Sequence, residues 1–102
     1  MDEPVIARRQ LEIVNTYGLH MRPADKFVKL ANSFRSEVWV YHRGRRANGK
    51  SILDMTSLAA ECGATLDLEA RGPDADAALS ALADLVAAGF HMTEEDYRQP
   101  VP

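Results

Sequence analysis

Residues 18–24, Gly-Leu-His-Met-Arg-Pro-Ala, place a histidine at the point where a loop becomes a helix. The first N–H groups of a helix have no intrahelical partner, and the aligned peptide dipoles leave partial positive charge there. An anion attached to His20 would therefore meet ready donors. Arg22 adds a forked cation two residues further along. His20 is a candidate phosphate acceptor on this basis, although a lone histidine in this position is more often a helix cap or simply exposed.

A helix is predicted over residues 21–32, directly after His20. Four apolar residues recur at the helical spacing and define its buried face: Ala24, Phe27, Val28 and Ala31. Lys26 and Lys29 fall on another face. Pro23 is tolerated near the start, because its missing N–H would have no helical partner there.

The remaining elements follow from changes of hydrophobic period at turn residues. Alternation predicts strands over residues 10–13, 37–41 and 65–71, and a short strand ending near residue 48 after a turn at Gly44. Helical spacing predicts a short helix from Ser51 to about residue 60 and a longer one over residues 75–88, which Gly89 ends. The order β-α-β-β-α-β-α is typical of an α+β fold, an antiparallel sheet with its helices on one face.

Composition limits the class of protein. The chain has 102 residues, 46% of them hydrophobic, which suits one small domain with a single core. We expect the core over about residues 8–90 and a loose tail over residues 91–102, which have no apolar period. No stretch of the sequence suits a signal segment or a membrane span, and a single cysteine suits a reducing compartment, so we expect a cytoplasmic protein without membrane insertion.

A nucleic-acid partner is not expected. The net charge is −3, and the basic stretch formed by Arg43, Arg45, Arg46 and Lys50 is more often a solvated loop than a binding patch. His42 and His91 have no second ligand at metal spacing, so we expect no metal site.

Ser51 lies inside two overlapping patterns. With Asp54 three residues later, it is typical of a helix N-cap, which contributes about 1 kcal/mol on average. Residues 44–51 also match the phosphate-loop pattern G-x-x-x-x-G-K-[ST]. That motif functions in a parallel sheet, whereas the strands here alternate as in a sheet with one exposed face. A nucleotide-binding protein using Gly44 to Ser51 therefore remains only a remote alternative.

The sequence resembles the HPr family of phosphocarrier proteins over about residues 10–90. The resemblance is carried by residues 18–24, by Phe27-Val28-Lys29 and by Gly49-Lys50-Ser51-Ile52. It implies an open-faced β-sandwich of four antiparallel strands and three helices. It also implies that His20 accepts a phosphoryl group on Nδ1 from enzyme I, which phosphoenolpyruvate charges, and passes it to an EIIA-type protein. Such a protein is a cofactor-free carrier in sugar uptake rather than a stand-alone enzyme.

Arg22 is expected to stabilise the phosphorylated state more than the helix dipole does. The dipole contributes about 0.3 to 1 kcal/mol at an exposed site. A charge-assisted hydrogen bond contributes roughly 1.5 to 3 kcal/mol.

The resemblance implies further site residues. In some family members the serine matching Ser51 is phosphorylated by HPr kinase/phosphorylase, and Ile52 and Leu53 would lie in the docking surface. We expect Met21 to influence partner fit, and the cations Lys26, Lys29 and Lys50 to steer acidic partners. An alternative is a nitrogen-branch or regulatory paralogue that acts mainly through docking and Ser51 phosphorylation. Outward strand positions in the family are usually small or polar. Trp39 and Tyr41 should point away from the helices, so these two aromatic residues depart from the family pattern.

Overall fold

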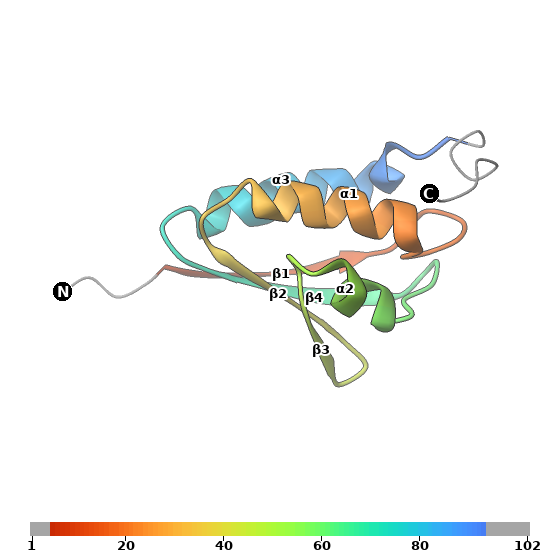
Figure 1. Ribbon diagram of the computed structural model, residues 1–102, viewed down its shortest axis with the longest axis horizontal. Helices are drawn as coiled ribbons and strands as arrows, with labels where there is room; N and C mark the ends of the chain where they lie inside the picture. The colour runs from red at the N-terminus through yellow and green to blue at the C-terminus, as the bar shows by residue number, and fades with distance from the viewer. Residues whose placement is uncertain (1–4, 94–102) are drawn as a thin grey trace.

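The computed structural model describes residues 5–93 and contains a four-stranded sheet with helices packed against it (Figure 1). Along the chain the elements are β1 (Ile6–Glu12), α1 (Met21–Asn32), β2 (Glu37–His42), β3 (Arg45–Asn48), α2 (Ile52–Ser57), β4 (Thr65–Arg71), α3 (Ala75–Ala87) and the one-turn 3-10 helix η1 (Gly89–His91). The strand order is β1-β4-β2-β3, and every neighbouring pair is antiparallel. The predicted fold class is confirmed.

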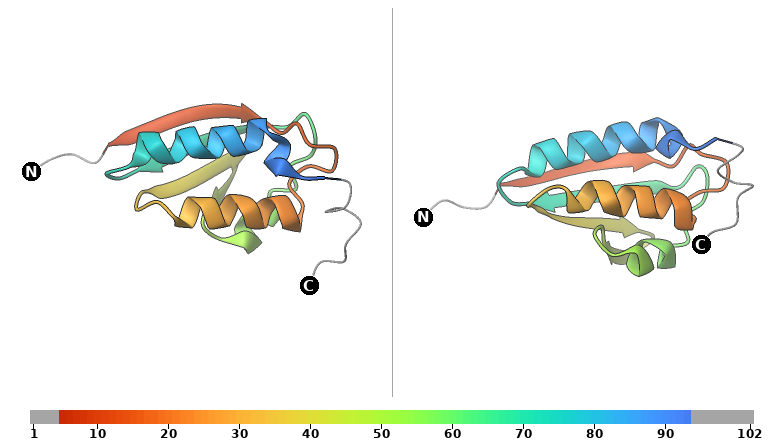
Figure 2. Two further views of the ribbon diagram at one scale, coloured as in Figure 1. Left: turned by 90° about the horizontal axis from the view of Figure 1, so that it is seen from above. Right: turned by 45° about the horizontal axis from the view of Figure 1, so that its top comes forward.

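Two long helices form the second layer. α1 and α3 lie side by side over one face of the sheet, and α2 packs against α1 and β3 (Figure 2). The core lies between these layers, where fully buried strand residues such as Val40, Leu66 and Leu68 meet Phe27 of α1 and Leu82 of α3. Burial of one such side chain contributes roughly 1.5 to 3 kcal/mol. This core fixes the position of the loop before α1.

The helix α2 is shorter than predicted. It ends at Ser57 with Leu58 as its C-cap, not near residue 60. The backbone of Ala59 then takes a left-handed conformation, with φ of 52°. This turn leaves Ala60 buried and its carbonyl oxygen bonded to the N–H of Leu19, 2.8 Å away. A tertiary contact with the loop before α1 therefore replaces the last helical turn.

The ordered fold extends beyond the predicted boundary at residue 90. Gly89 has the expected left-handed backbone after α3, with φ of 62°. Phe90 is fully buried, η1 includes His91, and Met92 packs against the core. The structure therefore continues two residues past the approximate boundary predicted at residue 90, and residues 94–102 of the predicted tail lie outside the described part of the chain.

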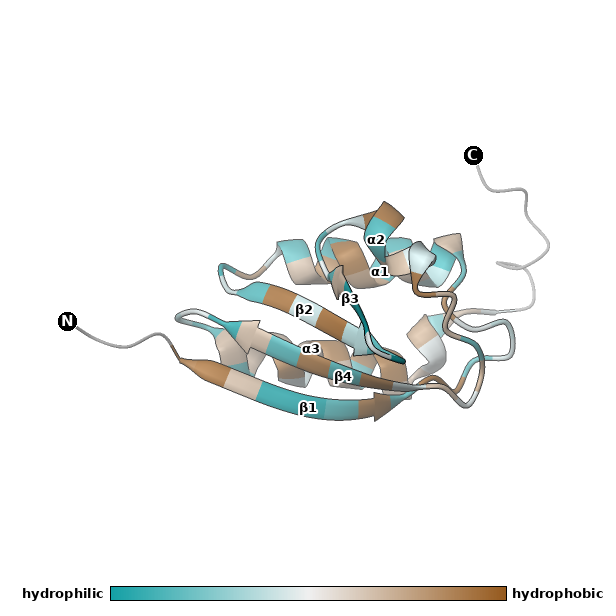
Figure 3. Ribbon diagram, turned by 90° about the horizontal axis from the view of Figure 1, so that it is seen from below, coloured by the Kyte–Doolittle hydropathy of each residue, from teal (hydrophilic) through white to brown (hydrophobic). Residues whose placement is uncertain are grey.

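Figure 3 shows the sheet from the side opposite α1 and α3, where β2 and β4 have alternating hydrophilic and hydrophobic bands and the middle of β1 is hydrophilic. Trp39 lies on this face, as predicted, with the guanidinium carbon of Arg46 4.3 Å from its ring centroid. A cation over an indole contributes about 0.5 to 1 kcal/mol at an exposed site. Trp39 is therefore partly covered by its own hairpin partner.

Glu69 on the same face is buried, although alternation predicts it to be solvated. Its carboxylate accepts hydrogen bonds from Nε of Arg8 at 2.9 Å and Nε of Arg71 at 3.1 Å. Burial alone would raise the pKa of Glu69, but the two arginines outweigh it and hold the pKa below its ordinary value. The long side chains of neighbouring strands thus bury a charge that the sequence pattern places in water.

The stretch that matches a phosphate loop has a different structure. Gly44 lies in the turn of the β2–β3 hairpin, and residues 45–48 form a strand antiparallel to β2. A nucleotide site of the phosphate-loop kind requires a loop between a parallel strand and a helix. This geometry removes the support for the nucleotide-binding alternative. Within residues 5–93, no helix is long and apolar enough to cross a membrane.

Candidate functional site

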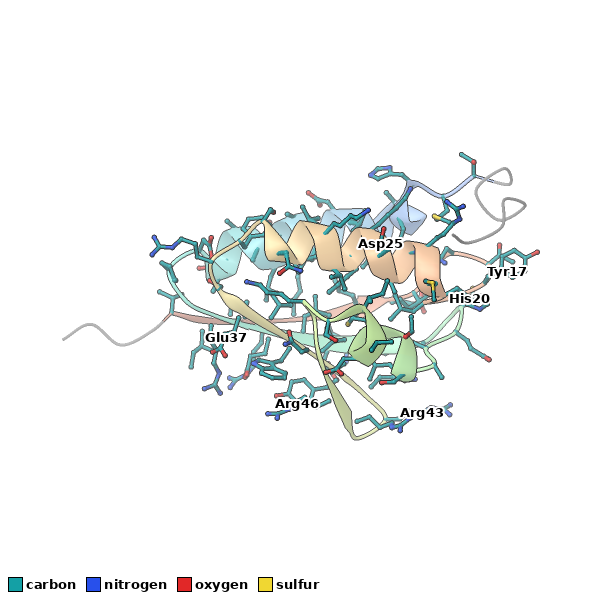
Figure 4. The ribbon with its side chains drawn as sticks, in the orientation of Figure 1. Tyr17, His20, Asp25, Glu37, Arg43 and Arg46 are labelled. Carbon is teal, nitrogen blue, oxygen red and sulfur yellow. The ribbon has the colours of Figure 1, made fainter. Side chains whose placement is uncertain are left out.

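His20 is the N-cap residue of α1 and is exposed (Figure 4). Its backbone is extended, and its carbonyl oxygen accepts a hydrogen bond from the N–H of Ala24 at 2.9 Å. Its side chain makes no capping hydrogen bond. The imidazole is therefore not used as a helix cap, and it remains exposed at the positive end of the helix.

The loop before His20 is held by backbone contacts. Nδ2 of Asn15 donates to the carbonyl oxygen of Gly18 at 2.7 Å, and the N–H of Gly18 donates back to the carbonyl oxygen of Asn15 at 3.1 Å. Gly18 has φ of 72°, which favours glycine. A β carbon there would lie 2.5 Å from the carbonyl oxygen of Ala60. The corner that presents His20 is consequently rigid and tolerates only glycine at this position.

The first turn of α1 offers an anion donors near His20. Arg22 is half-buried in this turn. Pro23 has no N–H, and the N–H of Ala24 already bonds to His20, so the backbone donors are those at the very start of the helix. The structure thus places Arg22 and the helix start in the same turn that follows His20.

Tyr17 is a neighbour of His20 that sequence reasoning missed. The two ring centroids are 6.2 Å apart and the planes are inclined by 54°. Figure 4 shows both side chains at the same end of the molecule. Aromatic rings at this separation and tilt attract one another modestly. Its position three residues before His20 was the only signal in the sequence.

A hollow of about 390 Å³ opens beside His20. It is lined by Leu19, His20, Met21, Thr56, Ala59, Ala60 and Glu61. Thr56 belongs to α2, and the last three residues follow that helix. The chain thus brings α2 and the loop after it next to the predicted phosphate acceptor, a juxtaposition that no local sequence pattern could indicate.

The predicted apolar docking residues differ in exposure. Met21 and Leu53 are exposed to 48% and 78%, respectively. Ile52 is less exposed than these two residues: it is half-buried, because part of its side chain packs against the core. Met21 and Leu53 can therefore offer apolar surface to a partner, whereas Ile52 also holds α2 in place.

The predicted steering cations are already engaged within the chain. Nζ of Lys26 donates to the carbonyl oxygen of Phe90 at 3.1 Å, and Nζ of Lys50 donates to the carbonyl oxygen of Phe34 at 2.7 Å. Lys29 pairs with Asp25 at 2.8 Å on the exposed surface of α1. Their charges still contribute to the electrostatic field around α1. Lys26 also stabilises the position of η1, and Lys50 that of the segment after α1.

Ser51 is the N-cap of α2, as predicted. Its hydroxyl oxygen accepts a hydrogen bond from the N–H of Asp54 at 3.3 Å. The Asp54 carboxylate in turn accepts from the N–H of Asn48 at 3.1 Å. The capping interpretation of the serine is therefore confirmed, and Ser51 is half-buried at the start of the helix.

The other histidines lie outside this site. His42 contacts the carbonyl oxygen of Thr65 through Nδ1 at 3.2 Å, and His91 lies in η1. Among residues 5–93, no group of three histidine, cysteine or acidic side chains could hold a metal ion.

Comparisons with known proteins identify a family and relatives for the chain. A family model described as the PTS HPr component phosphorylation site matches residues 7–88. The chain is 43% identical to the phosphocarrier protein HPr of Neisseria meningitidis serogroup A over 83 residues, which cover 81% of this chain and 93% of the relative. It is 40% identical to the phosphocarrier protein NPr of Shewanella violacea over 82 residues, or 80% of this chain and 90% of the relative.

A solved structure is similar as well. The crystal structure of HPr-C-His from Thermoanaerobacter tengcongensis superposes with a TM-score of 0.82 at 38% sequence identity. The match covers 85% of this chain and 98% of that chain.

Proposed function

The chain belongs to the HPr family of phosphocarrier proteins of the phosphotransferase system, and we propose that His20 carries a phosphoryl group from enzyme I to an EIIA-type protein in sugar uptake. The observation that carries this proposal is the exposed imidazole of His20 at the start of α1, which makes no capping bond. A ring in this position can face first a donor protein and then an acceptor protein without any change of fold.

The transfer itself requires only the ring nitrogen. A neutral imidazole attacks with the lone pair on Nδ1 and needs no separate base. As the new N–P bond forms, the bond between phosphorus and the donor atom breaks, and its electron pair stays with the donor. Transfer to the acceptor repeats the exchange and returns His20 with its lone pair. Positioning and electrostatics supply the catalysis.

Arg22 and the start of α1 stabilise the phosphorylated state in this proposal. A guanidinium can donate two parallel hydrogen bonds to phosphate oxygens, and the N–H groups of the first turn add a partial positive charge. This stabilisation must be moderate, because a carrier has to release the group to its next partner.

The docking surface combines the corner at His20 with α2. Met21 lies beside His20 in the same hollow as Thr56, and Leu53 is the most exposed apolar residue of α2. Exposed apolar groups around a reactive residue favour a protein partner. We assign Met21 and Leu53 to contacts with enzyme I and EIIA, with Ile52 supporting them from beneath. Lys26, Lys29 and Lys50 supply positive charge around α1.

The test measures first the phosphorylation of the protein and then the transfer of the phosphoryl group to an acceptor. Phosphoenolpyruvate and catalytic enzyme I should load one acid-labile phosphate onto the protein. The loaded protein is then mixed with EIIA proteins of the sugar branch and of the nitrogen-related branch. Relatives named both HPr and NPr match this chain, so the faster acceptor identifies the branch. Loading without transfer to any EIIA would contradict the carrier role.

Regulation at Ser51 is a second candidate function, and the position of α2 favours it. Ser51 caps α2, and the same helix contributes Thr56 to the hollow beside His20. A phosphate on Ser51 by an HPr kinase/phosphorylase would add about −1.5 to −2 charges near the docking surface without unfolding the helix. Repulsion of partners would then slow the loading of His20.

A further inference from the structure

Glu61 carries a negative charge into the hollow beside His20. Of the side chains that line this hollow of about 390 Å³, Glu61 is the only acidic one. Together with Ala59 it also lines a larger hollow of about 820 Å³, so these two residues lie between the two hollows. The carboxylate is exposed, and it lies on the loop that follows α2.

The position of Glu61 relative to His20 is fixed by the backbone. Leu19 donates its N–H to the carbonyl oxygen of Ala60 at 2.8 Å. The backbone of Gly18 approaches so closely that a β carbon there would lie 2.7 Å from Cα of Glu61. The carbonyl oxygen of Glu61 accepts from the N–H of Ala64 at 2.9 Å. These contacts hold the backbone of Glu61 against the loop that carries His20.

A phosphoryl group on His20 would place new negative charge close to this carboxylate. Both residues line one hollow of about 390 Å³, whose width is comparable with one screening length, ~8–10 Å at physiological salt. Their repulsion is not abolished by solvent at this range. Arg22 acts in the opposite sense, because it attracts the phosphoryl group.

We infer that Glu61 destabilises the phosphorylated form of His20 and so sets how readily the protein gives up its phosphoryl group. The inference rests on the proposed function and deepens it. Arg22 holds the group, and Glu61 limits how tightly it is held. A carrier between two proteins benefits from this balance, because too stable a phosphohistidine would load well and transfer poorly.

The equilibrium of loading tests this inference without interference from docking. The protein is incubated with catalytic enzyme I and fixed ratios of phosphoenolpyruvate to pyruvate, and the ratio of phosphorylated to free protein is measured by ³¹P NMR. A catalyst does not change an equilibrium, so a variant's altered contacts with enzyme I do not affect the measured ratio. Glu61→Gln keeps the size of the side chain and removes its charge.

We expect Glu61→Gln to raise the ratio of phosphorylated to free protein about threefold to tenfold at low salt. The increase should shrink as salt is raised to ~1 M, where the screening length falls to about 3 Å. Glu61→Asp, which keeps the charge, should stay near wild type.

Glu37→Gln is the matched control, because Glu37 is exposed and lies at the end of the molecule opposite His20 (Figure 4). It should leave the ratio unchanged. If Glu61→Gln behaves like Glu37→Gln while the wild type loads normally, the inference is wrong and the proposed function stands. Failure of the wild type to load would overturn the proposed function, and this inference with it.

Discussion

The backbones of Gly18 and Ala60 touch so closely that a β carbon on Gly18 would lie 2.5 Å from the carbonyl oxygen of Ala60. This contact joins the loop before His20 to the loop after α2, although the two residues are far apart in the chain. It is the structural reason why His20, the loop after α2 and Glu61 lie beside one another.

Gly18→Ala should therefore damage both stability and loading. A left-handed backbone costs a residue with a β carbon roughly 1 to 2 kcal/mol, and displacement of Ala60 adds to it, for a total of about 2 to 4 kcal/mol. Thermal unfolding measures the loss. Gly44→Ala is the control, since Gly44 has φ of 77° but nothing within 4 Å of the added carbon. Equal losses in the two variants would contradict the role of the Gly18–Ala60 contact.

Arg22→Ala should weaken the phosphorylated state of His20. Loss of a charge-assisted bond of about 1.5 to 3 kcal/mol corresponds to a roughly 10- to 150-fold lower ratio of phosphorylated to free protein. Arg22→Lys should fall in between, because an ammonium keeps the charge but not the fork. The same equilibrium with phosphoenolpyruvate and pyruvate measures this, with Arg35→Ala, an exposed arginine beyond the end of α1 opposite His20, as control. An unchanged ratio for Arg22→Ala would remove Arg22 from the site.

Ser51→Asp should slow the loading of His20 by enzyme I. Aspartate can still cap α2, so the helix should persist while a negative charge is added beside the docking surface. We expect a higher KM for the variant in the loading reaction and little change in thermal stability. Ser80→Asp, on the exposed surface of α3, adds the same charge elsewhere. Loading of Ser51→Asp at the wild-type rate would count against regulation at this serine.

Asp74→Asn should make the fold less stable at neutral pH but not in strong acid. The Asp74 carboxylate accepts hydrogen bonds from the Ser36 hydroxyl at 2.5 Å and from the N–H groups of Arg35 and Ser36 at 2.9 Å each. These hydrogen bonds lower the pKa of Asp74 from its ordinary 3.8 to about 2, and the bond from the Ser36 hydroxyl has the largest effect.

A lowered pKa means that this stabilisation is fully present above the unfolded value of 3.8 and is lost as the pH falls through about 2. Chemical unfolding at several pH values should thus show wild type and Asp74→Asn converging between pH 4 and pH 2. Asp76→Asn, in the same helical turn, should show no such convergence. A pH-independent difference between wild type and Asp74→Asn would show that the hydrogen bonds do not depend on the ionised carboxylate.

The sequence predicted those elements whose hydrophobic period is uninterrupted. Residues 21–32 and 65–71 form α1 and β4 with the expected bounds. The end of α2 was predicted wrongly, because Ala59 and Ala60 leave the helix to meet Leu19. The helix propensity of these two alanines does not predict that contact.

The site was predicted only in part, because a sequence pattern indicates local neighbours but not tertiary contacts. His20 and Arg22 lie in one local motif, so the sequence alone placed them at the start of a helix. Tyr17 and Glu61 were missed, because one acts through a ring contact and the other comes from a distant loop. Lys26 and Lys50 were predicted as cations that steer partners, and their bonds to Phe90 and Phe34 were missed because these depend on the tertiary fold.

The central claim is that His20 is the phosphate acceptor, and one measurement tests it directly. Wild type, His20→Ala and His42→Ala are incubated with phosphoenolpyruvate and a cognate enzyme I, and their intact masses are recorded before and after mild acid. We predict one acid-labile phosphate on wild type and on His42→Ala, and none on His20→Ala. Absence of the adduct from wild type, or its persistence in His20→Ala, would contradict the account.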